Sequence, residues 1–309
     1  MKWKSRDVIS ILDFTREDLE TLFHEALEIE RRPEKYSRAL EGKLVGLAFF
    51  EPSTRTYLSF DAAVKRMGGN TIGFTQETST SIAKGESFAD TVRTLDLYVD
   101  CLVIRHPLEG SSRFASEIAR SPVINAGDGS QHHPTQTFVD FYALWRRFGY
   151  ISGLVIGVLG DLRYSRAASS FILGLTLYRP RKLYLISPPL LRLREEVRAY
   201  LAASGLAFEE IDRLEDVMHE LDVLYVTRVQ RERFPDPGEY EKVRGSYRVD
   251  GRVLAKAKAE AVLMHPLPRV EELTYEVDRA PQAYYFKQAS YGVPVRMALL
   301  KLVLLGESS

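Results

Sequence analysis

The run Ser53-Thr54-Arg55-Thr56 follows an apolar stretch at residues 44–50 and precedes a segment with helical spacing. At a helix start, free backbone N–H groups and the helix dipole favour an anion, and hydroxyls and a guanidinium add further donors. These residues therefore predict a site for a phosphate-sized anion. The plainer alternative is an N-cap by Ser53, but a cap needs only one such residue. The site is not a Walker loop, because the sequence lacks GxxxxGK[ST].

Two further expected strands end in polar residues. Arg105 follows the apolar run CLVI, and the segment INAGDGSQHHPTQ places His133 and Gln136 at the start of a predicted helix. The adjacent pair His132-His133 invites a metal interpretation, but no other His, Cys or acidic cluster has ligand spacing. We therefore expect no metal ion here. The plainer interpretation of His133 is a capping or core histidine.

The composition favours a soluble protein of two ordinary domains. The chain has 309 residues, 45% of them hydrophobic and 27% charged, with a formal net charge of zero. This balance gives no global basic field for nucleic acid. No apolar run is long enough for a transmembrane helix, and the N-terminal residues lack a signal-peptide core. The single cysteine, Cys101, excludes a disulfide within the chain and favours the cytoplasm; we expect it to be a small buried residue.

Short β-rich runs alternate with helical patterns along the whole chain, which predicts an α/β fold with parallel sheets flanked by helices. A break near residues 148–153 separates two such domains, and the last helix, residues 285–305, is expected to pack back on the first domain. The expected strands are residues 44–50, 101–105, 123–126, 154–159, 182–186, 223–227 and 261–264. The expected helices are residues 54–67, 88–98, 135–148, 166–177, 195–203 and 214–221.

Seven motifs then occur in one order and spacing: FFEPSTRT, STSIAKGES, RHPLEGSSR, NAGDGSQHHPTQ, GDLRYSR, YVTRVQRER and MHPLPR. Together they resemble the catalytic chains of the aspartate carbamoyltransferase family, over essentially the whole sequence. The resemblance implies a carbamoyl phosphate-binding domain at residues 1–149, with residues 285–309 packing on it, and an aspartate-binding domain at residues 150–284.

The implied reaction transfers the carbamoyl group of carbamoyl phosphate to the amine of L-aspartate. The products are N-carbamoyl-L-aspartate and phosphate, in de novo pyrimidine (UMP) biosynthesis. Because carbamoyl phosphate is already activated, neither a cofactor nor a metal is expected. Donors aimed at the oxygens that gain negative charge are the main catalytic device.

The resemblance also assigns residues to this reaction. The implied catalytic residues are Arg55, Thr56, Arg105 and His133. The implied carbamoyl phosphate-binding residues are Ser53, Thr54, Arg55, Thr56, Arg105, His133, Gln136, Leu267 and Pro268, with Ser81 and Lys84 from a neighbouring subunit. The implied aspartate-binding residues are Lys84, Arg166, Arg228, Gln230 and Leu267. For domain closure, Glu51 is expected to pair with Arg166 and Arg233.

The family also implies an assembly. A loop that crosses between subunits makes a homotrimer the expected active unit. Two such trimers are expected to combine with three dimers of a zinc-containing regulatory chain into an allosteric complex, with Glu109 and Arg113 near the contact. Two residues depart from the family pattern. Tyr57 stands where a basic residue is common, and His132 stands where another polar residue is common; we expect His132 to be exposed to solvent.

Three alternatives remain at this stage. Ornithine carbamoyltransferase shares the STRT and HPTQ motifs, but it typically has HCLP where this chain has HPLP, and it lacks the STSxxKGE loop. A nonenzymatic anion-binding protein on the same fold would not require the full set of phosphate, carbonyl and carboxylate groups. A nucleotide-binding dehydrogenase is weaker, because the glycines at Gly157 and Gly160 do not form GxGxxG.

Overall fold

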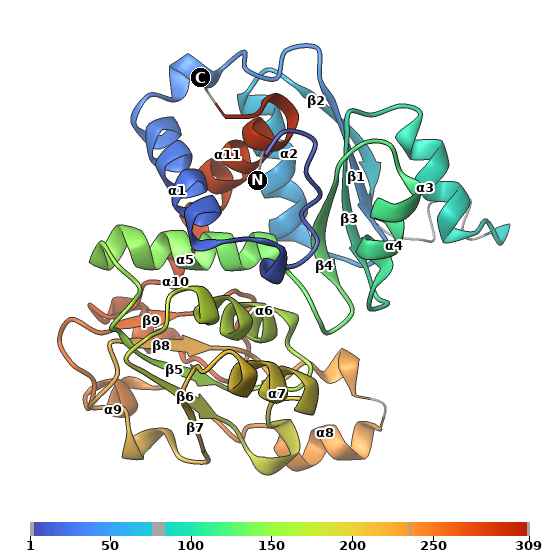
Figure 1. The fold of residues 1–309 in the computed structure, drawn as a ribbon. Helices are drawn as coiled ribbons and strands as arrows, with labels where there is room; N and C mark the ends of the chain where they lie inside the picture. Colours follow the sequence, from blue (N-terminus) through green and yellow to red (C-terminus); the bar gives the residue numbers. More distant parts are fainter. Residues whose placement is uncertain (1–2, 76–83, 235, 308–309) are drawn as a thin grey trace. The chain divides into compact units, whose positions relative to one another are not determined.

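The computed structural model describes residues 3–75, 84–234 and 236–307. It divides into two compact units: unit 1 comprises Met1–Tyr142 and Tyr291–Ser309, and unit 2 comprises Ala143–Ser290. Each unit contains a parallel sheet flanked by helices (Figure 1). The predicted fold class is therefore confirmed. Among the described residues, no helix has both the length and the apolar character needed to cross a membrane.

The elements of unit 1 are α1 (Arg16–Arg31), β1 (Leu44–Phe49), α2 (Thr54–Arg66), β2 (Asn70–Phe74), α3 (Phe88–Asp96), β3 (Cys101–His106), α4 (Ser111–Ile118), β4 (Val123–Asp128), α5 (Pro134–Phe148), whose last residues belong to unit 2, and α11 (Gly292–Leu305). The sheet has the strand order β2-β1-β3-β4. Figure 1 shows α1, α2 and α11 on one side of this sheet and α3 and α4 on the other. Because helices cover both faces, β1, β3 and β4 are almost fully buried and apolar.

The elements of unit 2 are β5 (Val155–Leu159), α6 (Arg166–Gly174), β6 (Lys182–Ile186), α7 (Glu195–Ala203), β7 (Phe208–Ile211), β8 (Val223–Val226), α8 (Pro237–Val243), α9 (Gly251–Leu254), β9 (Val262–Met264) and α10 (Tyr285–Ser290). The sheet has the strand order β7-β6-β5-β8-β9, with every neighbouring pair parallel. β5 and β8 are buried along their whole length, so the middle of this sheet is also its core.

Several elements differ from the predictions. The expected helix at residues 214–221 is only a short 3-10 helix, Leu214–Asp216, so that prediction was wrong. The expected terminal helix is two helices, α10 and α11, on either side of Tyr291. Strands β2 and β7 and helices α1, α4, α8 and α9 were not predicted. Cys101 is buried, as predicted, and burial raises the pKa of its thiol.

Candidate active site

In both sheets the order in which the chain adds strands reverses between two middle strands. In unit 1 the chain leaves β1 for β2 and then resumes at β3 on the other side of β1. In unit 2 the chain passes from β5 through β6 to β7 and resumes at β8 on the other side of β5. Loops at the carboxyl ends of such neighbouring strands diverge and leave room for a ligand. The predicted anion-binding residues follow these strand ends in both units.

The anion loop of unit 1 runs from the end of β1 to the start of α2. Ser53 is the N-cap residue of α2, but its side chain makes no capping hydrogen bond to this helix within the described structure. The plainer interpretation of the run, a simple N-cap, therefore fails. Thr54 and Arg55 are exposed, whereas Thr56 is buried in the first helical turn. The loop thus presents a helix N-terminus and an arginine to an incoming anion.

Arg105 lies beside this loop because of the sheet register. It is paired with Phe49 across the parallel strands β1 and β3. Its Nη2 lies 2.9 Å from Oε1 of Glu51, and its Nη1 donates to the Ala126 carbonyl at 3.3 Å. These contacts hold the guanidinium at the carboxyl end of the sheet. Glu51 and Arg105, predicted to serve closure and catalysis respectively, are thus direct neighbours in unit 1.

His133 and Gln136 enter the same edge from the turn that follows β4. The backbone N–H of Asp128 donates to the His132 carbonyl at 3.1 Å, which closes the turn and aims the chain into α5. His133 is buried, with Nδ1 3.4 Å from the Thr135 hydroxyl oxygen, and Gln136 is half-buried in the first turn of the helix. His132, expected to be exposed, is half-buried, with Nδ1 3.4 Å from the Ser10 hydroxyl oxygen.

Asp128 fixes the loops after β3 and β4 to one another. Its buried carboxylate accepts hydrogen bonds from the Gly110 backbone at 3.0 Å and from the Asn125 side chain at 2.9 Å. Gly129 follows with φ +47°, and a Cβ there would lie 2.2 Å from the Glu109 side chain. Glycine is therefore required where the two loops meet. The residues around Arg105 and His133 are thereby held on one rigid edge.

In unit 2, the loops after β5 and β8 carry the predicted carboxylate-binding residues. Arg166 is buried and opens α6, which Ser165 caps by accepting from the Ala168 backbone. Arg228 and Gln230 are half-buried in the segment after β8. The strands pair in register at their ends, which brings the two loops together. Two arginines and an amide suit recognition of carboxylates.

Asp161 links these two loops. One carboxylate oxygen accepts from the backbone of Tyr164 at 2.8 Å and Arg163 at 3.1 Å, and the other accepts from the Gln230 backbone at 3.2 Å. Burial raises the pKa of Asp161 to about 6, against the lowering effect of these hydrogen bonds and of Arg228. This carboxyl therefore titrates much closer to neutrality than an ordinary aspartate.

Leu267 is held by a buried histidine after β9. The Leu267 backbone donates to Nδ1 of His265 at 2.8 Å, so Nε2 carries the proton and donates to Glu272 at 2.8 Å. Burial lowers the pKa of His265, which favours the neutral imidazole. Leu267 itself has φ +58°, a left-handed conformation that is costly for a leucine. The His265–Glu272 pair thus supports the turn that carries Leu267 and Pro268.

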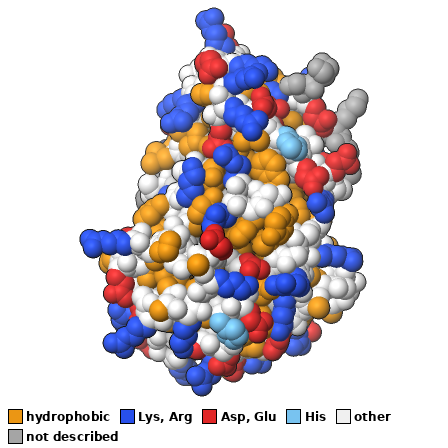
Figure 2. Space-filling view, turned by 90° about the vertical axis from the view of Figure 1, so that its left-hand side faces the viewer, with side chains coloured by type: hydrophobic (Ala, Val, Ile, Leu, Met, Phe, Trp, Pro, Cys, Tyr) orange, Lys and Arg blue, Asp and Glu red, His pale blue; other side chains and the backbone are white. Residues whose placement is uncertain are grey.

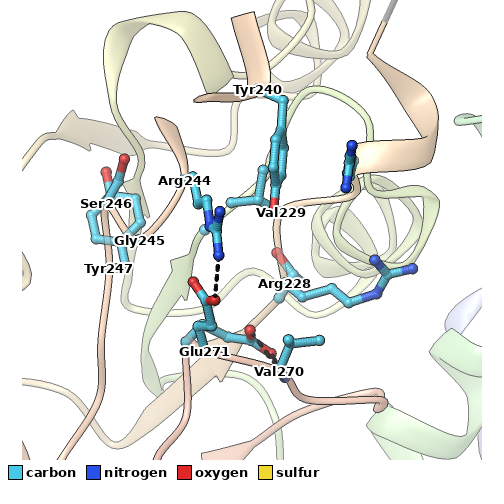
Figure 3. Close-up of a pocket in the computed structure, with 13 residues that line it drawn as sticks. Arg228, Val229, Tyr240, Arg244, Gly245, Ser246, Tyr247, Val270 and Glu271 are labelled. Atoms are coloured by element: carbon cyan, nitrogen blue, oxygen red, sulfur yellow. Dashed lines mark hydrogen bonds and ion pairs between the residues drawn. The ribbon is translucent and has the colours of Figure 1, made fainter. Parts of the chain in front are cut away.

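A cavity of about 100 Å³ within unit 2 is lined in part by Arg228 (Figure 3). Arg244 extends toward Glu271, with Nη2 and Oε1 3.1 Å apart, and the Tyr240 ring faces the same space. The lining is completed by backbone and side-chain groups that include Gly160, whose φ of +117° and close approach to the Thr227 carbonyl require glycine. This space is large enough for a carboxylate-sized group.

The remaining predicted residues have simpler surroundings. Ser81 lies outside the described residues, and Lys84 is exposed. Arg233 is half-buried at the end of a short 3-10 helix, Arg231–Arg233. Tyr57 packs edge-on against Phe49, with ring centroids 5.2 Å apart.

Within the described ranges, no group of three or more His, Cys, Asp or Glu could hold a metal ion. Acidic and basic side chains are interspersed on the face in Figure 2.

Two family models match the chain. Residues 6–146 match the carbamoyl-P binding domain of aspartate/ornithine carbamoyltransferase, and residues 152–303 match its Asp/Orn binding domain. The chain therefore belongs to the aspartate/ornithine carbamoyltransferase family. The resemblance read from the seven sequence motifs is confirmed.

Individual relatives are aspartate carbamoyltransferases. The catalytic subunit from Thermofilum pendens is 60% identical over 301 residues, which are 97% of this chain and 96% of that protein. The catalytic subunit from Hyperthermus butylicus is 61% identical over 304 residues, with the same coverage. A solved structure of the Trypanosoma cruzi enzyme with carbamoyl aspartate and phosphate has a TM-score of 0.93 at 36% identity, covering 98% of this chain and 97% of that chain.

Proposed function

We propose that this chain catalyses transfer of the carbamoyl group from carbamoyl phosphate to L-aspartate. The observation that carries the proposal is its near-full-length identity with aspartate carbamoyltransferase catalytic subunits, at about three residues in five. Solved structures of the Trypanosoma cruzi relative contain carbamoyl phosphate, aspartate or N-(phosphonacetyl)-L-aspartic acid. The donor-rich loops of this chain fit ligands of that chemistry. We further place the reaction in cytoplasmic pyrimidine biosynthesis.

Unit 1 supplies the carbamoyl phosphate site in this proposal. The α2 N-terminus with Ser53, Thr54 and Arg55 binds the phosphate group. Thr56, Arg105 and His133 donate to the carbonyl oxygen, and Gln136 accepts from the carbamoyl NH₂ group. The aspartate amine attacks the carbonyl carbon, negative charge grows on the carbonyl oxygen, and the C–O bond to phosphate then breaks. The leaving phosphate takes the amine proton. Donors fixed before the reaction stabilise this charge without reorganisation.

Unit 2 supplies the aspartate site. Arg166 and Arg228 bind the two carboxylates, which suits the planar, bidentate geometry of guanidinium groups. Gln230 completes this set. The His265–Glu272 pair supports the turn that carries Leu267. The Leu267 carbonyl faces the amide groups of the reactants, with Pro268 beside it. The proposed substrate-binding domains are residues 1–149 and 150–284, with residues 285–309 packing on the first; the compact units of the structure divide instead after Tyr142 and before Tyr291.

The proposal includes an assembly and a closing step. We infer that the active unit is a homotrimer in which Ser81 and Lys84 enter the neighbouring site. Glu51 would form pairs with Arg166 and Arg233 when both substrates are bound. Zinc-containing regulatory dimers would join two trimers near Glu109. Glu109 is exposed and accepts a hydrogen bond from the Ser130 backbone at 3.3 Å. Light scattering of this chain, co-expressed with a candidate regulatory chain, tests the larger complex.

A phosphate-release assay tests the activity itself. Purified protein is supplied with carbamoyl phosphate and either L-aspartate or L-ornithine, and the carbamoylated product is identified by mass spectrometry. Release that depends on aspartate, with N-carbamoyl-L-aspartate as product, is the expected result. Release that depends only on ornithine would replace the proposed substrate, and release with neither amino acid would leave an anion-binding protein. Arg55→Ala is the inactive control.

A further inference from the structure

Gln136 and Asp140 form a hydrogen-bonded pair one turn apart on α5. Gln136 Nε2 donates to Asp140 Oδ1 at 2.7 Å. Asp140 is completely buried, whereas Gln136 is only partly covered in the first turn, with its backbone N–H on the His133 carbonyl at 3.0 Å. The pair thus connects the predicted catalytic edge of unit 1 to its interior.

The chemistry of this contact fixes which end of the Gln136 amide faces outward. A glutamine side chain offers an oxygen that only accepts and an NH₂ group that only donates, and the two ends have nearly the same shape. An ionised carboxylate only accepts. Turning the amide over would place its oxygen against the Asp140 carboxylate, and both groups would lose a hydrogen bond. The NH₂ group therefore faces Asp140, and Oε1 is left for a ligand.

A buried arginine, Arg296, interacts electrostatically with Asp140. Burial lowers the pKa of Arg296 to about 10, and the Asp140 charge opposes that shift. The Arg296 guanidinium is anchored on α11, where Nη1 donates to the Gly292 carbonyl at 3.2 Å, and it lies 5.0 Å from the centroid of the Phe60 ring. Gly292 leaves the necessary room, since a Cβ there would lie 2.8 Å from Nη1. A buried carboxylate needs such compensation.

We propose that Asp140 is a positioning residue that holds Gln136 as a hydrogen-bond acceptor and so makes the site select an acyl phosphate carrying NH₂ over one carrying methyl. The inference rests on the proposed function, in which Gln136 contacts the carbamoyl NH₂ group. An acceptor aimed at that position rewards an N–H donor and is left unpaired by a methyl group. The device would exclude acetyl phosphate from the site.

Two phosphonates of equal shape provide the test. Phosphonoacetamide carries NH₂ on its carbonyl carbon, and acetonylphosphonate carries methyl in the same place. Calorimetry should give the wild-type protein a roughly 10- to 100-fold preference for phosphonoacetamide. In Asp140→Asn, residue 140 can both donate and accept, so Gln136 can turn over and the preference should fall below about fivefold. The charge-removal control, Asp216→Asn on the exposed surface of unit 2, should keep the full preference.

Further measurements separate the outcomes. Inorganic phosphate should bind Asp140→Asn as tightly as wild type, which shows an intact phosphate loop. Gln136→Leu should lose the preference, and adding Asp140→Asn to it should change nothing more, because the aspartate acts only through the glutamine. A full preference retained in Asp140→Asn would overturn the positioning role. Failure of wild type to bind either phosphonate would instead overturn the proposed function.

One measurement does not depend on how Asp140→Asn folds. In wild-type protein labelled with ¹⁵N-glutamine, the Gln136 side-chain NH₂ signal is assigned by its loss in Gln136→Leu. The two protons should be strongly inequivalent and slow to exchange, and phosphonoacetamide should leave them bonded to Asp140. Rapid exchange, or displacement of this NH₂ signal by the ligand, would contradict the proposal.

Discussion

Oε1 of Glu51 lies 2.9 Å from Nη2 of Arg105, and the two side chains are only 16% and 15% exposed. The pair is therefore better shielded than an ordinary surface ion pair, which contributes little. It also occupies the guanidinium that the proposed reaction needs. A phosphate or carbonyl oxygen that approaches Nη2 of Arg105 would compete there with the Glu51 carboxylate. Substrate binding at Arg105 would therefore release the Glu51 carboxylate, which could then form other contacts.

Replacing Glu51 tests its contact with Arg105 separately from its proposed role in domain closure. In Glu51→Ala, phosphate affinity should equal that of wild type or be up to about fivefold tighter, because Arg105 loses a competing anion. Turnover should nevertheless fall at least about tenfold, because the proposed closing contacts are gone. Calorimetry with phosphate and steady-state kinetics with aspartate check both quantities. Glu41→Ala, which removes an exposed partner of Arg38, is the matched control and should behave as wild type. Weaker phosphate binding in Glu51→Ala would contradict the competition.

The two adjacent histidines offer an internal comparison. His133 is buried at the start of α5, whereas His132 lies toward Ser10. His133→Ala should lower kcat about 10²- to 10³-fold, as expected for loss of one donor to a developing oxyanion. His132→Ala should stay within about threefold of wild type, because its ring lies beside Ser10, with Nδ1 3.4 Å from the hydroxyl oxygen, and has no proposed contact with substrate. Steady-state kinetics at saturating substrates distinguishes the two. Equal losses in both variants would point to a disturbed turn rather than a catalytic donor.

The central strands could be predicted from sequence because burial on both faces makes them continuous apolar runs. The edge strands β2 and β7 could not be recognised in this way. Their residues are largely half-buried or exposed, and each strand pairs on one side only. Such strands depend on the neighbour that recruits them. Their identity is therefore a property of the sheet rather than of the local sequence.

The helix predictions failed for two different physical reasons. Leu214, Val217, Met218 and Leu221 have helical spacing and are all buried, yet only residues 214–216 are helical. Residues 217–220 form a turn instead, and β8 begins shortly afterwards at Val223. In contrast, the sequence before α1 contains a clear signal for the start of a helix. Thr15 and Asp18 form a capping box, followed by an amphipathic pattern.

Residue type alone indicated which donors could bind anions. The acids that position them were not predicted, because Asp128, Asp140 and Asp161 resemble ordinary loop or helix-surface residues in sequence. All three are buried: Asp128 and Asp161 accept from the Gly110 and Gln230 backbones, which become neighbours only after the strands align, whereas Asp140 accepts from Gln136 one turn away on α5. One local signal existed, since Asp128 and Asp161 each follow a glycine at the end of an apolar strand.

Asp161 predicts a pH dependence confined to aspartate binding. Burial raises its pKa to about 6, so below that pH the carboxyl is protonated and its acceptance from the Gln230 backbone weakens. The KM for aspartate should rise as the pH falls through about 6, with the KM for carbamoyl phosphate much less affected. In Asp161→Asn the aspartate KM should be raised at every pH and should lack this acidic limb. A limb of unchanged position in the variant would assign it to another group.

The pH dependence of folding stability that Asp161 causes has the opposite sign to its effect on aspartate binding, so the two can be distinguished. Because the folded pKa of Asp161 is raised above its ordinary value of 3.8, the folded state binds the proton more tightly. The contribution of this carboxyl to stability is therefore full below pH about 4 and is lost as the pH rises through about 6. Thermal unfolding between pH 5 and 8 should show no loss of stability at the acidic end that depends on Asp161. Acid destabilisation that disappears in Asp161→Asn would reverse this sign.

The proposed trimer makes a quantitative prediction for mixed subunits. Arg55 would act in its own subunit's site, and Lys84 would act in the neighbour's site. A chain carrying Lys84→Ala and a chain carrying Arg55→Ala should each be inactive alone. In every mixed cyclic trimer, however, one of the three sites pairs an intact Arg55 with an intact Lys84. Random exchange of equal amounts forms mixed trimers in about three cases of four, so about a quarter of wild-type activity should return.

The control for this experiment uses a chain that carries both changes. Mixed with the Lys84→Ala chain it offers no intact Lys84, and mixed with the Arg55→Ala chain it offers no intact Arg55, so neither mixture should recover. Exchange is verified by native mass spectrometry, with one variant isotopically labelled. If mixed trimers form and the single variants together regain nothing, Lys84 does not act across subunits. Recovery well above about one quarter would also contradict this arrangement, because random exchange leaves one intact site in each mixed trimer and none in the others.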